Sequence, residues 1–315
     1  MLARVANNLF WMGRYIERSE HIARYLNVNY FSSLDASNTL SQSRQFVLRS
    51  MLFLVGEKIE DPNTILNEEE VLYKIGLNPD SPHSILNNIK NARENANSAR
   101  DLISTELYES LNKFYHFSLN YPVDTFVKNG LYDFTTNITE MSSVLRGKIR
   151  DTLLHDEVYA IIMMGMNIER ATQITRIINS KYNDALKAQM DCGQELGKSF
   201  EWTTLLKCTE SYDMMRRFYK KTPTSISTLE FLILNPKCPR SVMSSLNQVY
   251  HHILLLDTNK YYNKSSTAFL VGKVRCEYQY KHIEEIEGDI KAFIENILES
   301  LNQVSIKMEK EFFNY

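Results

Sequence analysis

Apolar residues recur at intervals of three and four along most of this chain. The segments ILNNIKNARENANSARDLI (85–103) and IEEIEGDIKAFIENILESLNQV (283–304) show the spacing clearly. Such spacing places apolar side chains on one face of an α-helix. Only 7 prolines and 10 glycines interrupt the 315 residues, and alternating segments bounded by hairpin turns are nearly absent. The pattern therefore predicts an all-α protein.

Two pairs of matching segments lie in the same order along the chain. MGRYIERSEHIARYLN (12–27) and MGMNIERATQITRIIN (164–179) share 8 of 16 residues at an offset of 152. LNPDSPHS (77–84) and LNPKCPRS (234–241) follow at an offset of 157. Chance resemblance between amphipathic helices does not readily explain two ordered pairs, so the sequence predicts a tandem duplication. We expect one domain over residues 1–315, a helical bundle of two pseudo-symmetric repeats packed as one unit, approximately 1–150 and 151–315.

The second pair of segments has the residues of a corner between helices. Proline stops one helix and suits the first turn of the next, where no N–H is needed, and we expect Pro82 and Pro239 to lie in such first turns. Ser84 and Ser241 would then lie in the same turn, where a hydroxyl can accept from a free backbone N–H. A repeated corner is favoured over a binding loop.

The helix predicted at the N-terminus is apolar or aromatic on two sides. One stripe is aliphatic, and the opposite side carries Phe10, Trp11 and Tyr25 among its charges. A helix of this kind is normally buried, so some of its charges must be paired.

Gly13 and Gly165 occupy equivalent positions of the matching segments. Glycine inside a helix costs about 1 kcal/mol relative to alanine, so its recurrence suggests close approach of another backbone. We expect the two helices to cross at these glycines. Glu17 with Arg176, and Glu169 with Arg24, could pair across the crossing, although pairs within each copy are equally allowed.

The candidate site consists of charged residues of the matching segments and one arginine of segment 91–101: Arg14, Glu17, Arg18, Arg24, Arg93, Glu169, Arg170 and Arg176. A structural ion-pair network is the favoured interpretation. The alternative is a central pocket in which spare arginines bind a carboxylate or phosphate, because the guanidinium fork matches either group. Arg14 is replaced by Met166 in the second copy, so we expect Arg14 to reach a cavity or the surface and to contribute little to stability. For Arg93 a solvated helical face is favoured over a place in this pocket.

Charge and composition exclude several classes of function. The net charge of −2 gives no general attraction to nucleic acid or to an anionic membrane. The N-terminal residues lack a secretory h-region, and the longest apolar run (158–168) is too short to span a bilayer. Four scattered cysteines favour a reduced, cytoplasmic protein. The chain has no phosphate-binding loop, dinucleotide fingerprint, nucleophile motif or metal-ligand spacing, so we expect no cofactor and no metal.

The segments RVANNLFWMGRYIERSEHIARYL, SPHSILNNIKNARENANSAR, MGMNIERATQITR and FLILNPKCPRSV together resemble the bacterial alpha-E domain family, whose members are all-helical and uncharacterised. The resemblance implies which genes lie nearby, and it does not imply a particular reaction. Such proteins are encoded beside, or fused to, an ATP-grasp amide-ligase-like protein, with a transglutaminase-like peptidase and sometimes a proteasome-like hydrolase nearby. In the second copy Met166 and Asn167 replace the arginine and tyrosine of the GRYxER motif, so a symmetric two-site arrangement is not expected.

The leading hypothesis is an accessory protein of a peptide-modification system, which binds a peptide or a partner enzyme of the ATP-grasp-like or transglutaminase-like kind. A second hypothesis is an enzyme acting on an anionic peptide-like substrate, with Glu17 or Glu169 as general acid or base and nearby arginines holding the anionic group. A third is a structural module that forms a homodimer.

Overall fold

The computed structural model describes residues 2–34, 43–57, 59, 61, 64–192, 195–256, 263–286 and 288–313, without the side chains of 187–199. The described residues contain helices and no strand, so the prediction of an all-α protein is confirmed. The first helices are α1 (Ala3–Leu34), α2 (Arg44–Leu54), α3 (Glu68–Gly76), α4 (Ile85–Ser98), α5 (Thr105–Asn120), α6 (Val123–Thr125) and α7 (Leu131–Thr152). They are followed by α8 (Glu157–Cys192), α9 (Glu195–Cys208), α10 (Tyr212–Tyr219), α11 (Ser225–Leu229), α12 (Val242–Leu256), α13 (Thr267–Gln279) and α14 (Ile290–Met308).

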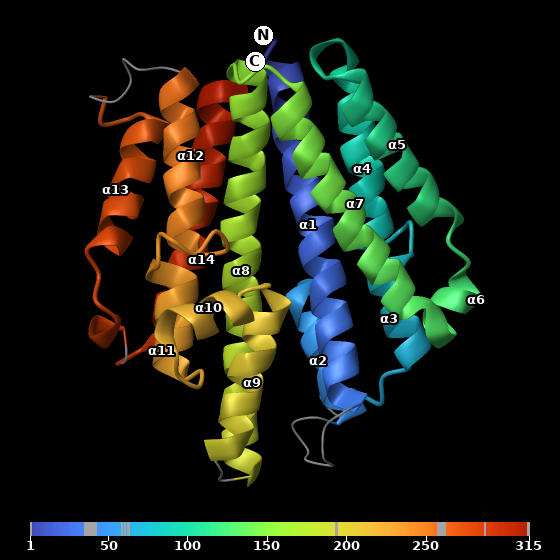
Figure 1. Cartoon of the computed structure of the whole chain (residues 1–315), viewed down its shortest axis with the longest axis vertical. Coiled ribbons are helices and arrows are strands. Elements are labelled where there is room, and N and C mark those ends of the chain that lie inside the picture. The colour runs from blue at the N-terminus through green and yellow to red at the C-terminus, as the bar shows by residue number, and fades with distance from the viewer. Residues whose placement is uncertain are drawn as a thin grey trace.

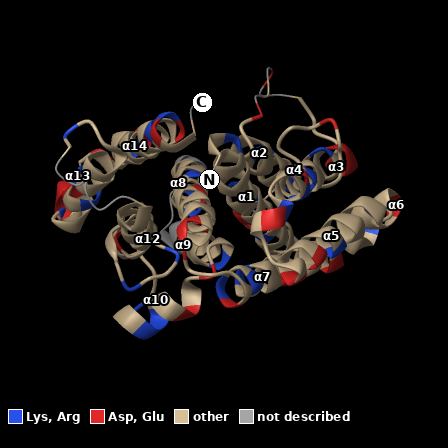
Figure 2. Ribbon diagram, turned by 90° about the horizontal axis from the view of Figure 1, so that it is seen from above, with Lys and Arg blue, Asp and Glu red and all other residues tan. Residues whose placement is uncertain are grey.

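Two long helices, α1 and α8, run side by side through the middle of the molecule (Figure 1). On one flank α4 and α7 pack against α1, and α5 packs on both of them. On the other flank α12 and α14 pack against α8, and α13 packs on both. Seen from above, basic and acidic residues are interspersed around both flanks (Figure 2). Among the described helices, none combines the length and the low charge needed to cross a membrane.

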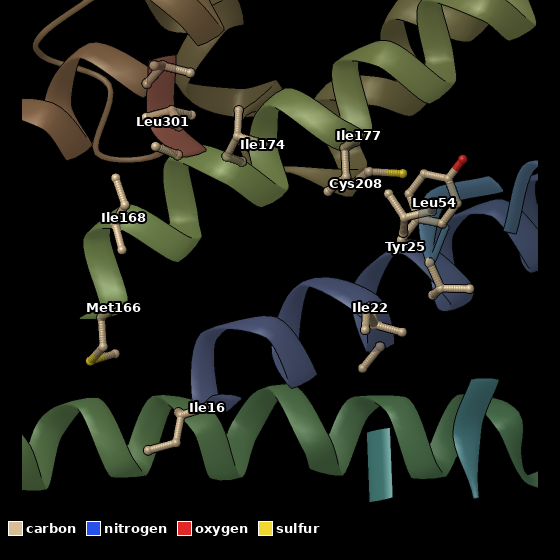
Figure 3. Close-up of a cluster of buried hydrophobic side chains, with 14 of the residues drawn as sticks. Ile16, Ile22, Tyr25, Leu54, Met166, Ile168, Ile174, Ile177, Cys208 and Leu301 are labelled. Carbon is tan, nitrogen blue, oxygen red and sulfur yellow. The ribbon is translucent and has the colours of Figure 1, made fainter. Parts of the chain in front are cut away.

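The core follows the apolar stripes of the two central helices. Ile16 and Ile22 of α1 and Ile168 and Ile174 of α8 belong to one buried cluster, which Leu301 of α14 joins (Figure 3). Because each central helix also packs against a flank, it needs apolar residues on more than one side. This requirement accounts for the aromatic second side of α1, where Phe10 and Tyr25 are fully buried.

The two central helices approach closely at Gly13 and Gly165, as predicted. A Cβ atom added to Gly165 would lie 2.1 Å from the carbonyl oxygen of Phe10, and one added to Gly13 would lie 2.5 Å from that of Ile162. Phe10 and Ile162 are themselves related by the offset of 152. The contact is therefore reciprocal, and at both positions the space is taken by backbone, which cannot move aside as a flexible side chain can.

The LNPxxPxS segments form corners with the same hydrogen bonds. Ser84 caps α4 by accepting from the Asn87 N–H at 3.1 Å, and Ser241 accepts from the Ser244 N–H at 2.9 Å at the start of α12. The expectation for the prolines is wrong. Pro82 and Pro239 lie in a turn two residues before these serines, because the serine side chain, and not the proline ring, starts each helix.

Candidate functional site

The Glu-Arg dipeptides of α1 and α8 exchange ion pairs across the helix crossing. Glu17 accepts hydrogen bonds from Nε and Nη2 of Arg170 at 2.6 and 3.0 Å. Glu169 accepts from Nε and Nη2 of Arg18 at 2.6 and 3.0 Å. Both carboxylates are fully buried. Each helix therefore supplies the carboxylate that binds the arginine of the other helix. Both pairs have the bidentate geometry in which a guanidinium binds a carboxylate most strongly.

The pairs that the helical wheel allowed across the crossing, Glu17 with Arg176 and Glu169 with Arg24, do not form. Glu17 binds Arg170 rather than Arg176, and Glu169 binds Arg18 rather than Arg24. Because the backbones touch at the glycines, each glutamate meets the arginine that directly follows its counterpart in the other helix. Arg24 pairs instead with Glu20 of its own helix and with Glu210 at 3.2 Å.

Each of the two carboxylates has one further partner four residues along its own helix. His21 Nε2 lies 3.3 Å from a Glu17 oxygen, and Gln173 Nε2 donates to Glu169 at 2.8 Å. His21 is fully buried, and this burial lowers its pKa even though Glu17 opposes the effect. The histidine is thus kept neutral beside a carboxylate whose charge the arginine already balances.

The electrostatics keep the two carboxylates ionised. Burial alone would raise the pKa of Glu17, but the charge of Arg170 and the hydrogen bonds from His21 and Arg170 hold it well below its ordinary value. Burial likewise opposes ionisation of Glu169, and Arg18 and Arg14 outweigh it, so that this pKa is also lowered. A buried carboxylate is ionised only where opposite charges and donors compensate for lost water, and that condition is met here.

A third buried carboxylate, Glu20, gathers three arginines on the α7 side of α1. Arg24 and Arg146 of α7 bond to it, and Arg240 donates to it at 3.1 Å from the corner before α12. Arg240 also donates to Glu210 at 2.6 Å. Burial raises the pKa of Glu20, but the charges of Arg24 and Arg240 dominate and the net pKa is lowered. This cluster ties α1, α7 and the second corner together.

Arg14 is part of the network and also reaches a cavity. Its Nε donates to Glu169 at 2.8 Å and its Nη1 donates to Ser305 of α14 at 2.7 Å. Its guanidinium lies 4.3 Å from the ring centre of Trp11. The expectation that Arg14 reaches a cavity is confirmed, since it lines one next to α14. The expectation of a small contribution to stability does not fit these contacts with a buried carboxylate.

That cavity has a volume of about 420 Å³ and lies between α8 and α14. Its charged and polar lining residues are Arg14, Thr172, Arg176, Glu295, Glu299, Asn302 and Ser305. Arg176 is exposed there and makes neither a hydrogen bond nor a salt bridge to the described part of the chain. It is the candidate arginine that the network leaves available.

Arg93 lies apart from the other candidates. Its Nε donates to Asn112 of α5 at 2.7 Å, and its guanidinium lies 4.8 Å from the ring centre of Tyr115. It therefore bridges α4 and α5 on the flank and is not in the central network.

Sequence reasoning missed members of the network that come from distant segments or from a different residue type, among them Arg146, Arg240 and Gln173. Arg146 and Arg240 lie 126 and 220 residues from Glu20 in the sequence, so no local pattern joins them. Gln173 aligns with His21 at the offset of 152, so the alignment of the two segments could have identified it. The position of Arg240 inside a repeated corner was a usable signal as well.

A second buried polar cluster, also missed, lies where α1, α2, α8 and α9 meet. Lys181 Nζ lies 3.0 Å from Asp184 and 3.3 Å from Glu201. Tyr25 shares hydrogen bonds of 2.6 and 2.7 Å with Ser50 and Ser180. Burial would lower the pKa of Lys181, but the two acids raise it well above its ordinary value, so the ammonium is charged. The cluster is a satisfied ionic support, not an activated amine.

Other chemistry among the described residues is limited. No group of three histidine, cysteine or acidic side chains is placed to hold a metal ion in the part of the chain described. Cys208 and Cys238 are buried and Cys276 is exposed, and all three are free thiols. The side chain of Cys192 lies outside the described residues. Burial raises the pKa of the Cys208 thiol to about 12, which makes it unreactive near neutral pH.

The fold and the site define an all-helical protein built around two Glu-Arg dipeptides that pair with each other across a helix crossing. A family described as a predicted alpha-helical domain with a conserved ER motif, Alpha-E, matches residues 1–313, and the chain belongs to this family. Uncharacterised proteins of Mycobacterium tuberculosis and Mycobacterium bovis are each 22% identical to it over 301 residues. The match covers 90% of this chain and 33% of each relative, so the chain spans about a third of their length. No solved structure matches the chain significantly.

Proposed function

We propose that this protein is an accessory component of a bacterial peptide-modification system, acting in the cytoplasm, which binds a peptide or a partner enzyme and does not carry out the chemistry itself. The state of Glu17 and Glu169 is the observation that supports this most. A general acid or base must reach the substrate and exchange a proton near neutral pH. Both carboxylates are fully buried, bound by arginine forks and held at low pKa.

The family of the chain also supports the accessory role. The resemblance to alpha-E proteins implies an ATP-grasp-like or transglutaminase-like partner, and we propose such an enzyme as the binding partner of this protein. The mycobacterial relatives are about three times as long as the matched region, so in them this domain belongs to a larger chain. A domain that is joined to other sequence in its relatives is well suited to work beside a second domain.

We further propose that the chain arose by tandem duplication of a unit of about 150 residues. Support comes from the reciprocal glycine contacts, the exchanged Glu-Arg pairs and the two matching corners. Along the chain, α1 is followed by α4 and α7, which both pack on it. In the same way α8 is followed by α12 and α14, which both pack on α8. Superposition of α1, α4 and α7 on α8, α12 and α14 tests this, and different relative placement of the three helices would refute it.

The experiment for the accessory role combines the purified protein with an ATP-grasp-like protein, the partner enzyme that we propose. Peptide product is followed by mass spectrometry, with ATP consumption measured in parallel. We expect no product from this protein alone, measurable binding to the partner by calorimetry, and a changed rate of product formation by the partner. Turnover by this protein alone would refute the proposal, as would a partner that neither binds it nor responds to it.

Glu169→Gln provides a control that separates the accessory role from catalysis. In the accessory role this change affects partner function only through unfolding of the protein or through Arg14, the cavity-lining residue that Glu169 binds. If the variant keeps its fold, its partner binding and its peptide binding but loses product formation, the carboxylate is catalytic and the enzyme hypothesis is favoured instead.

A further inference from the structure

The cavity beside α14 occupies the place that the Glu20 cluster fills in the other half of the molecule. Position 20 of α1 corresponds to Thr172 of α8 at the offset of 152, and Arg24 corresponds to Arg176. In α1 the Glu20 carboxylate bonds to Arg24, one helical turn further on. In α8 the corresponding residue is Thr172, which has no carboxylate to pair with Arg176. Both residues line the cavity.

The flanking helix differs in the same sense. α7 sends Arg146 to Glu20, whereas α14, which packs on α8 as α7 packs on α1, brings Ser305 to Arg14. The α14 residues that line the cavity include no arginine, and a threonine stands at the position that corresponds to Glu20. Both features leave space in the same region, where a cavity of about 420 Å³ is present. Pockets for small molecules commonly have volumes of roughly 300–1,000 Å³.

We propose that this cavity binds a zwitterionic ligand, an amino acid or short peptide with a free amino group and a free carboxylate. The ligand carboxylate lies against Arg176 and Arg14, in the position that the Glu20 carboxylate takes in the other half. The ligand ammonium lies toward Glu295 and Glu299 of α14. The inference deepens the proposed function by defining how a peptide would be held, and it rests on that function only for the choice of peptide as ligand.

The charges around the cavity fit such a ligand. Desolvation lowers the pKa of Arg176, Glu169 raises it, and Arg18 and Arg14 lower it again, with a net lowering. Arg176 makes no hydrogen bond or salt bridge to the described residues, and a carboxylate would supply a partner through two parallel hydrogen bonds. Glu295 and Glu299 are exposed one turn apart on α14, where they would repel a simple anion and attract an ammonium group.

The test measures binding of trialanine to the full chain by titration calorimetry. Its N-acetyl form lacks the ammonium and its C-terminal amide lacks the carboxylate. We expect trialanine to bind, and each blocked form to bind about tenfold more weakly or worse, because each loses a charge-assisted contact. L-Alanine identifies the source: equal affinity assigns the site to amino acids, and tighter binding of trialanine assigns it to peptides.

Three variants connect the binding to these residues. Arg176→Gln should weaken trialanine binding about tenfold while leaving the affinity of the amide unchanged. Arg150→Gln, on an exposed arginine outside the cavity, is the matched control and should have no effect. Thr172→Glu should abolish binding without unfolding the protein, because a glutamate there would pair with Arg176 as Glu20 pairs with Arg24. Thr172→Gln, of similar size and no charge, should weaken binding less.

Equal binding of trialanine and both blocked forms would overturn the proposal. So would unchanged affinity in Arg176→Gln, or the absence of binding at millimolar trialanine. Acetate binding as tightly as trialanine would overturn it too, since the acidic wall would then play no part. These failures would leave the accessory role standing, because partner binding and partner rate are measured without reference to this cavity.

Discussion

The two sides of the central helix pair use equivalent arginines for different purposes. On the α7 side, Arg24 is held by Glu20 and Glu210 in a filled, buried network. On the α14 side, Arg176 has no such acid, because position 172 is a threonine, and it lines a cavity. The crossing between the two sides is symmetric, with the same 2.6 and 3.0 Å contacts in both Glu-Arg pairs. The difference shows that the side chains around an arginine decide whether it supports the fold or stays available.

The largest effect is expected at the symmetric crossing. Glu17→Gln and Glu169→Gln each leave a partly buried arginine without its fully buried acid, and breaking a buried pair in this way costs on the order of 3–5 kcal/mol. Chemical denaturation should show a similar loss for both variants. A loss below about 1 kcal/mol, the range of exposed pairs, would contradict burial of the network.

A smaller effect is expected for Arg14→Met, which copies the residue of the second segment. The change removes one donor from Glu169 and one contact with Ser305, while Arg18 still holds the carboxylate. Hydrogen bonds to charged groups contribute roughly 1.5–3 kcal/mol, so we expect a loss of that order in the free energy of unfolding. Unchanged stability would restore the expectation drawn from sequence.

Gly165→Ala sharpens the comparison at the backbone contact. The added methyl would meet the Phe10 carbonyl oxygen at 2.1 Å, so we expect overpacking to cost about 1–3 kcal/mol. Gly147→Ala in α7 is the matched control, because apart from the adjacent backbone of α7 itself no atom lies within 4 Å of the added methyl there. It should be stabilised by about 0.5–1 kcal/mol through helix propensity. Equal effects of the two changes on the melting temperature would refute a close crossing.

The smallest effect concerns pH and lies on the α12 flank. Burial, with nearby His251 and His155, lowers the pKa of His252 to about 4 from an ordinary value of 6.5. The unfolded chain therefore binds this proton first, and the stability contributed by His252 is present above about pH 6.5 and declines as pH falls toward 4. His252→Phe should reduce the slope of this part of the denaturation profile, to which the buried His21 also contributes. An unchanged slope between pH 6.5 and 4.5 would contradict a buried neutral histidine.

Loss of stability at still lower pH should belong to the central carboxylates. Their folded-state pKa values lie below the ordinary 4.5, so their contribution is present above pH 4.5 and is lost as they protonate in acid. His252→Phe should leave this part of the profile intact, which separates the flank from the crossing in one series of measurements.

Much of this arrangement could be predicted from the sequence, because a few residues have few physical explanations. A glycine repeated inside two apolar helices indicates close backbone contact, and an acid on a helix with two apolar sides must be paired. The register of the pairs could not be predicted. A helical wheel gives the direction of Glu17 but not the crossing angle or the shift between helices, and these decide that Arg170, not Arg176, meets it.

The contrast between the α7 side and the α14 side could not be predicted from the sequence either. Whether the space beside Thr172 is a cavity or is filled depends on which residues α14 places there. α14 lies more than 100 residues after Thr172 in the sequence, so no local pattern joins them. The shared arginine of the two segments suggested equivalent roles. Only the surroundings, Glu20 and Arg146 on one side and Ser305 on the other, distinguish them.

The most direct measurement of that distinction compares Arg24→Gln with Arg176→Gln by urea denaturation at pH 7. Arg24 belongs to a buried ionic cluster, so its replacement should cost on the order of 3 kcal/mol. Arg176 makes no hydrogen bond or salt bridge to the described residues, so its replacement should change the free energy of unfolding by no more than about 0.5 kcal/mol. Equal losses in the two variants, or a larger loss for Arg176→Gln, would contradict the account.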